Sequence, residues 1–197
     1  MDLLTLGFLL FCIVLVIVYY LVPKAMQWWI LLAASLYFYA MSGIKNMIYV
    51  LITALSTYAA TRMIQSLTDR QKEWIKANKK TTSKEERAAY KAHIQAKRRA
   101  ILVAALLLNF GILCTFKYLH FLIAQVNTVI SSFGASPIND TLKLIIPLGI
   151  SFYTFQTMGY LVDVYWNKYP AEKNFGRVLL FVSFFPQMTQ GPISNYK

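Results

Sequence analysis

The stretch PLGISFYTFQTMGYLVDVYWNK at residues 147–168, together with LLFVSFFPQMTQGPISNY at 179–196, decides how this chain folds. Both stretches are apolar enough to lie in a lipid bilayer, yet both carry uncharged polar side chains, and the first carries one carboxylate, Asp163. Polar groups at membrane depth cost free energy, so they usually face a cavity or a neighbouring helix. We therefore expect the functional residues of the chain in these two stretches.

The composition of the whole chain is typical of a polytopic membrane protein. Of its 197 residues, 57% are hydrophobic, and they cluster in runs bounded by Lys and Arg. A soluble domain of this length scatters its charge along the sequence instead. The pattern predicts an all-α fold, a polytopic transmembrane helical bundle.

The net charge of +12 is concentrated in one segment. Residues 62–99 hold 12 Lys or Arg and 4 Asp or Glu. A basic block between hydrophobic segments is typical of a cytoplasmic loop under the positive-inside rule, and this interpretation is favoured over a nucleic-acid-binding patch. Within the block, Ser83 and Glu86 form a Ser-x-x-Glu capping box, which predicts a helix from Lys84 that feeds into the next span. This helix either binds anionic lipid headgroups or, as we favour, belongs to a solvated loop that sets the topology.

Three apolar runs precede the basic block and predict three N-terminal transmembrane helices within 1–61, at residues 3–22, 26–43 and 46–61. In the second run, Tyr37 and Tyr39 are expected at a membrane interface, where aromatic side chains are common. Arg62 is expected to end the third run.

After the basic cytoplasmic loop or helix at 62–99, residues 100–116 form another apolar run that Lys117 interrupts. Residues 118–133 predict an amphipathic helix that lies in the membrane interface. A last span at 144–166 then returns to the side of the basic block, where Lys168 and Lys173 follow it. The resulting topology has five crossings and an outside N-terminus.

In the stretch 147–168 the helical period gathers the polar residues on one face. At 100° per residue they fall within an arc of roughly 80°: Gly149, Tyr153, Gln156, Tyr160, Asp163 and Asn167. This face is either the wall of a hydrated tunnel or a seam that hydrogen-bonds neighbouring helices. Asp163 slightly favours the tunnel, although it can also pair with Lys168 or Lys173.

The second stretch contains an interrupted apolar segment. Residues 179–185 are too short to span a membrane, and Pro186 and then Gly191-Pro192 break the segment. Such breaks are tolerated in membranes where protein or a water-filled cavity covers the freed backbone groups. This predicts a re-entrant loop whose Gln187 and Gln190 line a cavity; the alternative is a span cut short.

No metal site, bound cofactor or catalytic residue is predicted. Cys12 and Cys114 lie in separate apolar runs, and neither His93 nor His120 has a partner at metal-ligand spacing. Acyl transfer to a hydroxyl needs a general base, and neither histidine belongs to a nucleophile–base motif.

The motifs PLGISFYTFQ (147–156) and FPQ with GPI (185–193) closely resemble recurring motifs of the membrane-bound O-acyltransferase (MBOAT) family. FKYL at 116–119 and the order of apolar runs fit the family more loosely. Within the family, the chain looks more similar to the bacterial alginate O-acetyltransferase membrane subunit than to the D-alanyl transferase of teichoic acids. Residues 188–190, Met-Thr-Gln, depart from the small residues often found before Gly-Pro-Ile.

The resemblance implies that residues 1–197 are the N-terminal portion of such an enzyme in the bacterial inner membrane, with 100–197 as a truncated MBOAT-like core. Relatives pass an acetyl group from a cytoplasmic donor, acetyl-CoA or another acyl thioester, to hydroxyls of an exported cell-surface polysaccharide. The implied partners are membrane lipid, that donor and acceptor, and an extracytoplasmic acyltransferase, with no nucleic acid.

The family uses an intramembrane histidine that no position here matches, so residues 1–197 alone are expected to be inactive. The predicted tunnel lining comprises Tyr153, Gln156, Tyr160, Asp163, Gln187 and Gln190. The alternative class is a non-enzymatic membrane protein, either transporter-like or scaffolding.

Overall fold

The computed structural model describes residues 6–79, 82–132 and 149–188. Within these residues the structure is helical and contains no strand, so the predicted all-α fold is confirmed. The helices are α1 (Leu6–Leu21), α2 (Lys24–Ser42), α3 (Ile44–Ala77), α4 (Lys84–Ser132), α5 (Ile150–Tyr165), α6 (Phe175–Ser183) and α7 (Phe185–Met188).

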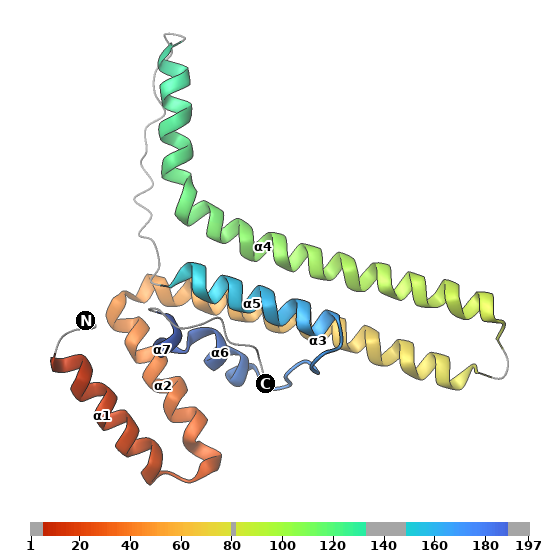
Figure 1. The fold of residues 1–197 in the computed structure, drawn as a ribbon, viewed down its shortest axis with the longest axis horizontal. Coiled ribbons are helices and arrows are strands. Elements are labelled where there is room, and N and C mark those ends of the chain that lie inside the picture. Colours follow the sequence, from red (N-terminus) through yellow and green to blue (C-terminus); the bar gives the residue numbers. More distant parts are fainter. Residues whose placement is uncertain (1–5, 80–81, 133–148, 189–197) are drawn as a thin grey trace.

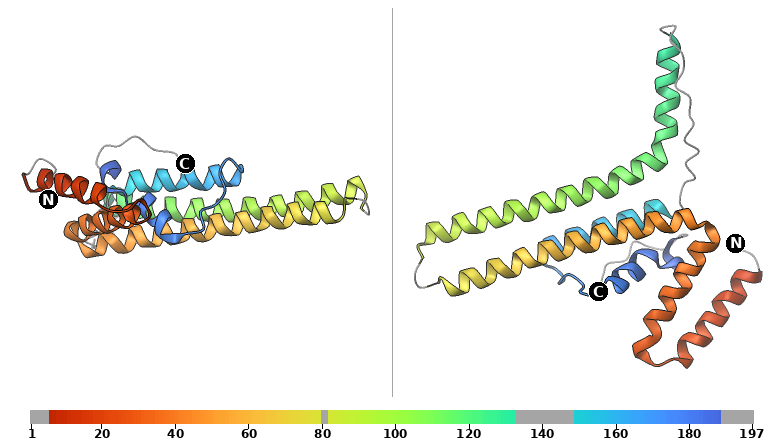
Figure 2. Two further views of the ribbon diagram at one scale, coloured as in Figure 1. Left: turned by 90° about the horizontal axis from the view of Figure 1, so that it is seen from below. Right: turned by 180° about the vertical axis from the view of Figure 1, so that it is seen from behind.

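The longest feature of the fold is an antiparallel hairpin formed by α3 and α4 (Figure 1). Helix α5 lies lengthwise along one side of this hairpin and contacts both of its helices (Figure 2). Helices α1 and α2 form a second hairpin near the start of α3, and α6 packs against α2 and α3. The core therefore sits where α2 to α6 meet, around buried residues such as Val50, Ile64, Leu161 and Val178.

Arg62 does not end the third helix. Helix α3 runs through Arg62 to Ala77 as one element of 34 residues. Lys, Arg, Gln and Glu are good helix formers, so a run of charge ends an apolar span without ending the helix. The basic block therefore forms two helical arms, the end of α3 and the start of α4, and Trp74 stacks on Tyr90 across them with ring centroids 4.1 Å apart.

The predicted capping box at the start of α4 is confirmed. The Ser83 hydroxyl accepts the backbone N–H of Glu86 at 3.1 Å, and the Glu86 carboxylate accepts the backbone N–H of Ser83 at 3.3 Å. Glu85 and Glu86 also lie in the first turn, where negative charge is favourable. The helix begins at Lys84, as the sequence predicts.

Lys117 does not interrupt α4, which continues to Ser132. The apolar run and the amphipathic stretch are thus parts of one helix. Figure 1 shows that this helix bends sharply and that its last, blue-green part turns away from the hairpin. A bend changes the direction of the chain while most backbone hydrogen bonds are kept. Whether this last part lies in a membrane interface stays a prediction.

Among the described residues, two helices are long and apolar enough to cross a membrane, at Met47–Ala77 and Lys84–Leu119. Leu6–Leu21 and Phe175–Gln187 are shorter apolar helices. Helix α1 buries none of its residues and exposes a continuous apolar surface, which suits contact with lipid. These features are those of a membrane protein, and the predicted count of five crossings stays a prediction.

Gly176 of α6 packs close to Trp28 of α2, and its substitution tests this packing. A Cβ atom at Gly176 would lie 2.9 Å from Trp28 Cζ3, whereas a Cβ atom at Gly159 on α5 would meet nothing within 4 Å. We expect Gly176→Ala to destabilise the fold by about 1–3 kcal/mol through overpacking. The matched Gly159→Ala should be neutral or stabilising by up to about 1 kcal/mol, since alanine is the better helix former. Thermal unfolding of the detergent-purified protein measures both, and equal effects would contradict this packing.

Candidate functional site

The polar face of α5 is buried in the helix bundle. Tyr153 and Tyr160 are 0% and 1% exposed, and Gln156 and Asp163 are 7% and 8% exposed, whereas Phe155 on the other face is 47% exposed. The helical period therefore predicted correctly which face of α5 turns away from lipid.

Both ends of α5 are set by backbone geometry. Gly149 precedes the helix with φ at 73°, a left-handed conformation that glycine adopts without steric cost. At the other end, Asn167 adopts a left-handed backbone conformation with φ at 57°. The backbone N–H of Lys168 donates to the carbonyl of Asp163 at 2.9 Å, and the backbone N–H of Asn167 donates to the carbonyl of Val164 at 3.0 Å. These bonds form a Schellman motif. Asn167 is therefore an exposed cap residue beyond the helix, and its predicted place on the polar stripe is wrong.

Arg98 on α4 binds this end of α5. Its Nη2 donates to the backbone carbonyl of Tyr165 and, at 3.3 Å, to Asn167 Oδ1. Its guanidinium also lies 5.2 Å from the centroid of the Tyr165 ring. A cation is favourable at a helix C-terminus, where the last carbonyls have no partner within the helix. Arg98 is 8% exposed, so this member of the basic block serves the packing of α4 against α5.

Two glutamines bring the two motifs together. The Gln156 amide Nε2 donates to Gln187 Oε1 at 3.0 Å. Gln187 reaches α5 because the chain breaks between α6 and α7 at Phe184, whose backbone is extended, just before Pro186. The predicted break near Pro186 is therefore confirmed. Gln190 and the Gly-Pro-Ile part of the second motif lie outside the described residues.

Asp163 forms an ion pair with Lys168. Asp163 Oδ1 and Lys168 Nζ are 3.3 Å apart, with side-chain exposures of 12% and 49%. The carboxylate sits in the last turn of α5, where the unpaired carbonyls disfavour negative charge, and Lys168 offsets this. Of the two lysines that the sequence offered as partners, Lys168 is the one that pairs with Asp163.

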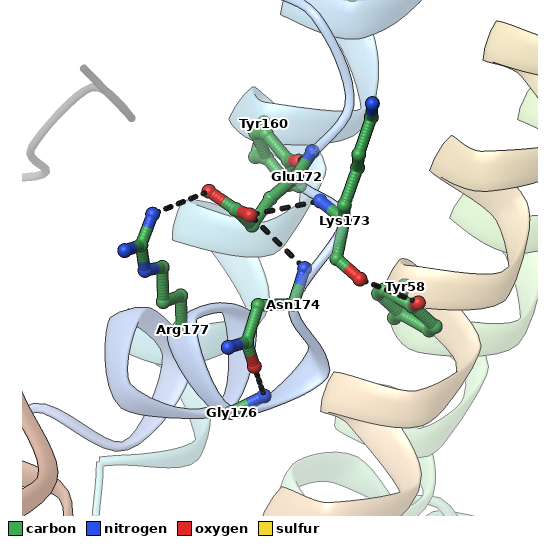
Figure 3. A network of polar contacts seen from close by, with 7 residues as sticks. All are labelled: Tyr58, Tyr160, Glu172, Lys173, Asn174, Gly176 and Arg177. Atoms are coloured by element: carbon green, nitrogen blue, oxygen red, sulfur yellow. Dashed lines mark hydrogen bonds and ion pairs between the residues drawn. The ribbon is translucent and has the colours of Figure 1, made fainter.

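A network of hydrogen bonds around Glu172, near Tyr160, holds the connection between α5 and α6 (Figure 3). The Tyr160 hydroxyl accepts the backbone N–H of Glu172 at 2.9 Å, and Tyr58 on α3 donates to the Lys173 carbonyl at 2.9 Å. The Glu172 carboxylate in turn accepts the backbone N–H groups of Lys173 and Asn174 at 2.8 and 3.0 Å and lies 3.8 Å from Arg177. This network was not predicted from the sequence.

One element of the network has a sequence signal. The Asn174 side chain accepts the backbone N–H of Gly176 at 2.8 Å and so caps the start of α6. Asparagine directly before an apolar run is a common N-cap. The contacts of Glu172 and Tyr58, by contrast, depend on where the loop lies in space.

Several further polar groups face the interior of the bundle. Tyr39 is 0% exposed and so faces the bundle, while Tyr37 is 54% exposed. The placement of the two tyrosines at a membrane interface stays a prediction. The Tyr39 and Tyr153 phenols are close enough to interact electrostatically. Buried side-chain atoms without a hydrogen-bond partner among the described residues include Ser35 Oγ, Tyr39 Oη, Thr57 Oγ1, Asn109 Nδ2, Tyr153 Oη and Ser183 Oγ. Such groups are able to bind water or a polar substrate.

A cavity of about 600 Å³ lies beside the junction of α6 and α7. Its lining is apolar and includes Phe8, Cys12 and Tyr19 of α1 together with Phe184 and Pro186. It contacts the second motif, but none of the residues predicted to line a tunnel. The contacts of Gln156, Tyr160 and Asp163 described above are those of a packing seam, so their role as a tunnel wall stays a prediction.

Both histidines belong to α4. His93 is exposed on the hairpin arm. No group of three or more His, Cys, Asp or Glu side chains that could hold a metal ion occurs in the part of the chain that the structure describes.

Known proteins were compared with the chain. It is 36% identical over 96 residues to the probable alginate O-acetylase AlgI of Pseudomonas aeruginosa. The match covers 49% of this chain and 18% of that protein. It is 37% identical over 89 residues to the probable alginate O-acetylase AlgI of Pseudomonas putida, 45% of this chain and 18% of that protein. The peptidoglycan O-acetyltransferase of Helicobacter pylori is 34% identical over 125 residues, 51% of this chain and 23% of that protein.

The chain is similar to bacterial O-acetyltransferases. This result confirms the resemblance to an MBOAT-type acetyltransferase that the two motifs indicate. The matched segments span only 18% to 23% of the relatives' own length. No family model and no solved structure matches the chain.

The glutamine pair can be tested with a double-mutant cycle of Gln156→Leu, Gln187→Leu and the combined variant. We expect a coupling free energy of roughly 0.6 kcal/mol, and at most about 1.7 kcal/mol, as for other interhelical hydrogen bonds in membrane proteins. Thermal unfolding in detergent provides the measurement. Phe155→Leu on the exposed face is the control and should show no coupling to Gln187→Leu. Additive effects of the two glutamine substitutions would contradict the contact.

Proposed function

We propose that this chain is part of a membrane O-acyltransferase that passes acetyl groups to hydroxyls of an exported cell-surface polysaccharide. The donor in this proposal is a cytoplasmic acyl thioester such as acetyl-CoA. The observation that carries the proposal is the contact between Gln156 and Gln187, because it joins the two acyltransferase-like motifs inside the bundle. The names of the relatives, which specify O-acetylation of alginate and of peptidoglycan, support the same reaction class.

The chemistry of the bundle interior suits this reaction. Transfer of an acetyl group passes through a tetrahedral intermediate whose oxyanion is stabilised by hydrogen-bond donors in a water-poor site. The buried hydroxyls of Tyr39 and Tyr153 are uncharged donors in such surroundings. Amide groups such as that of Gln156 can likewise bind a thioester carbonyl or a sugar hydroxyl.

A general base is also required to take the proton of the attacking hydroxyl. We propose that a histidine outside residues 1–197 supplies it, in another segment of the same polypeptide or in a partner subunit. An extracytoplasmic partner acyltransferase is part of the same proposal. Residues 1–197 then form one wall of the site and do not react alone.

The first test removes the gene that encodes this chain. We expect the cell-surface polysaccharide to lose its acetyl esters while its amount stays the same, because the proposed reaction modifies the polymer after synthesis. Nuclear magnetic resonance of the purified polymer and alkaline release of acetate measure the two quantities. A fall in exported polymer with unchanged acetyl content per sugar would instead support a transporter-like function.

The second test separates a tunnel wall from a packing seam, in cells that express the complete enzyme. We expect Gln156→Leu to lower the acetylation rate by about 100-fold, the typical cost of losing one donor to the reacting group. Asp163→Asn should lower it as well, whereas Lys168→Met, which breaks the same ion pair, should not. Acetylation is normalised to folded protein in the membrane. If the rate per folded molecule is unchanged and only the amount of protein falls, the polar face is a seam.

A further inference from the structure

A second site is formed where the two helices of the long hairpin leave their apolar spans. A groove of about 730 Å³ lies between α3 and α4, and its lining includes none of the residues of the polar face of α5. Its apolar lining is Met63, Leu67, Ala100 and Ile101, and its polar lining is Ser66, Arg62, Arg70 and Lys97. Among the described residues, three cations and no acid therefore line the groove, and its remaining lining is mostly apolar.

The three cations are available to bind a ligand. Arg62 is partly exposed, and Arg70 and Lys97 are exposed. None of the three makes an ion pair or hydrogen bond among the described residues, unlike the neighbouring Arg98, which binds the end of α5. The carboxylate of Asp69, which accepts the Gln65 amide at 2.9 Å, is not part of the groove lining. The described lining therefore carries a net positive charge.

The apolar part of the groove continues along both helices. Met63 within the groove is 55% exposed. Leu55 lies seven residues before Arg62 and Leu107 lies seven after Ala100, so each falls on the same helix face as its groove residue. They are 58% and 66% exposed. An apolar track that ends in three cations complements an amphiphile with an anionic head.

We propose that this groove binds an anionic phospholipid in the leaflet on the side of the basic hairpin arms. Arg62, Arg70 and Lys97 would bind the phosphate, because guanidinium groups match its oxygens and basic residues beside a membrane attract anionic headgroups. The acyl chains lie along Met63, Leu67 and the exposed residues beyond. A soluble phosphate ester lacks the chains that this track accommodates, so a lipid is the better match. The site goes beyond the proposed acyl transfer and does not depend on it.

The test uses residues 1–197 purified in detergent and titrated with phosphatidylglycerol or phosphatidylcholine, with binding followed by native mass spectrometry. We expect tighter binding of phosphatidylglycerol. The triple variant Arg62→Gln, Arg70→Gln and Lys97→Gln should lose about fivefold in affinity for each charge removed, on the order of 100-fold in total. The matched control Lys72→Gln, Lys76→Gln and Lys91→Gln removes three exposed charges outside the groove lining and should change the affinity less than about twofold.

Three outcomes would overturn the proposal. Equal losses in the two triple variants would mean a diffuse charge effect, and equal affinity for the two lipids would mean no headgroup recognition. Displacement of phosphatidylglycerol by glycerol phosphate or inorganic phosphate at similar concentrations would mean that the groove takes a soluble phosphate ester. Circular dichroism and thermal unfolding check that each variant folds. If the triple variant does not fold, the single variant Lys97→Gln, at an exposed position, replaces it and should lower the affinity for phosphatidylglycerol about fivefold.

Discussion

The arrangement of this protein depends on the burial of the polar face of α5. Tyrosine and glutamine side chains that faced lipid would leave hydrogen-bonding groups without partners, which is costly in a bilayer. Helix α5 therefore turns Tyr153, Gln156 and Tyr160 into the bundle and leaves Phe155 exposed. Packing α5 lengthwise along the hairpin of α3 and α4 satisfies this constraint, and α6 then covers the same region from the side of α2.

The constraint also places the second motif. Arg98 and the Schellman motif at Asn167 fix where α5 ends, and the hydrogen bonds of Tyr58 and Tyr160 fix the loop that follows. Helix α6 has nine residues and so rises about 13 Å. Gln156 lies nine residues before the end of α5. Along the helix axis it is therefore also about 13 Å from the loop that follows α5. The returning chain therefore reaches the level of Gln156 where α6 ends, and Gln187 of α7 meets it there.

The features that could be predicted from the sequence are those that depend on the spacing of residues close together in the chain. The buried face of α5, the capping box at Ser83 and the break near Pro186 all follow from residues a few positions apart. The extent of α3 does not follow from this spacing, because a run of charge marks the end of an apolar span and not the end of a helix.

The remaining misses depend on tertiary packing. The burial of Tyr39 depends on the elements that pack around it, of which α5 brings Tyr153 close, and the partners of Glu172 depend on the path of a loop. Neither has a periodic signal in the sequence. Only the N-cap Asn174 could have been recognised beforehand.

The distribution of charge limits what the bundle interior can bind. Among the described residues, its buried ionic groups are Asp163, which pairs with Lys168, and Arg98, which binds the end of α5, whereas Tyr153 and Gln156 are uncharged. Transfer of an unpaired ion into such surroundings costs far more than transfer of a neutral dipole that finds a hydrogen bond. The interior thus favours a thioester carbonyl or a sugar hydroxyl over a phosphate. Under the proposed function, the acyl group enters the bundle while the charged part of its donor stays outside, on the side of the basic hairpin arms.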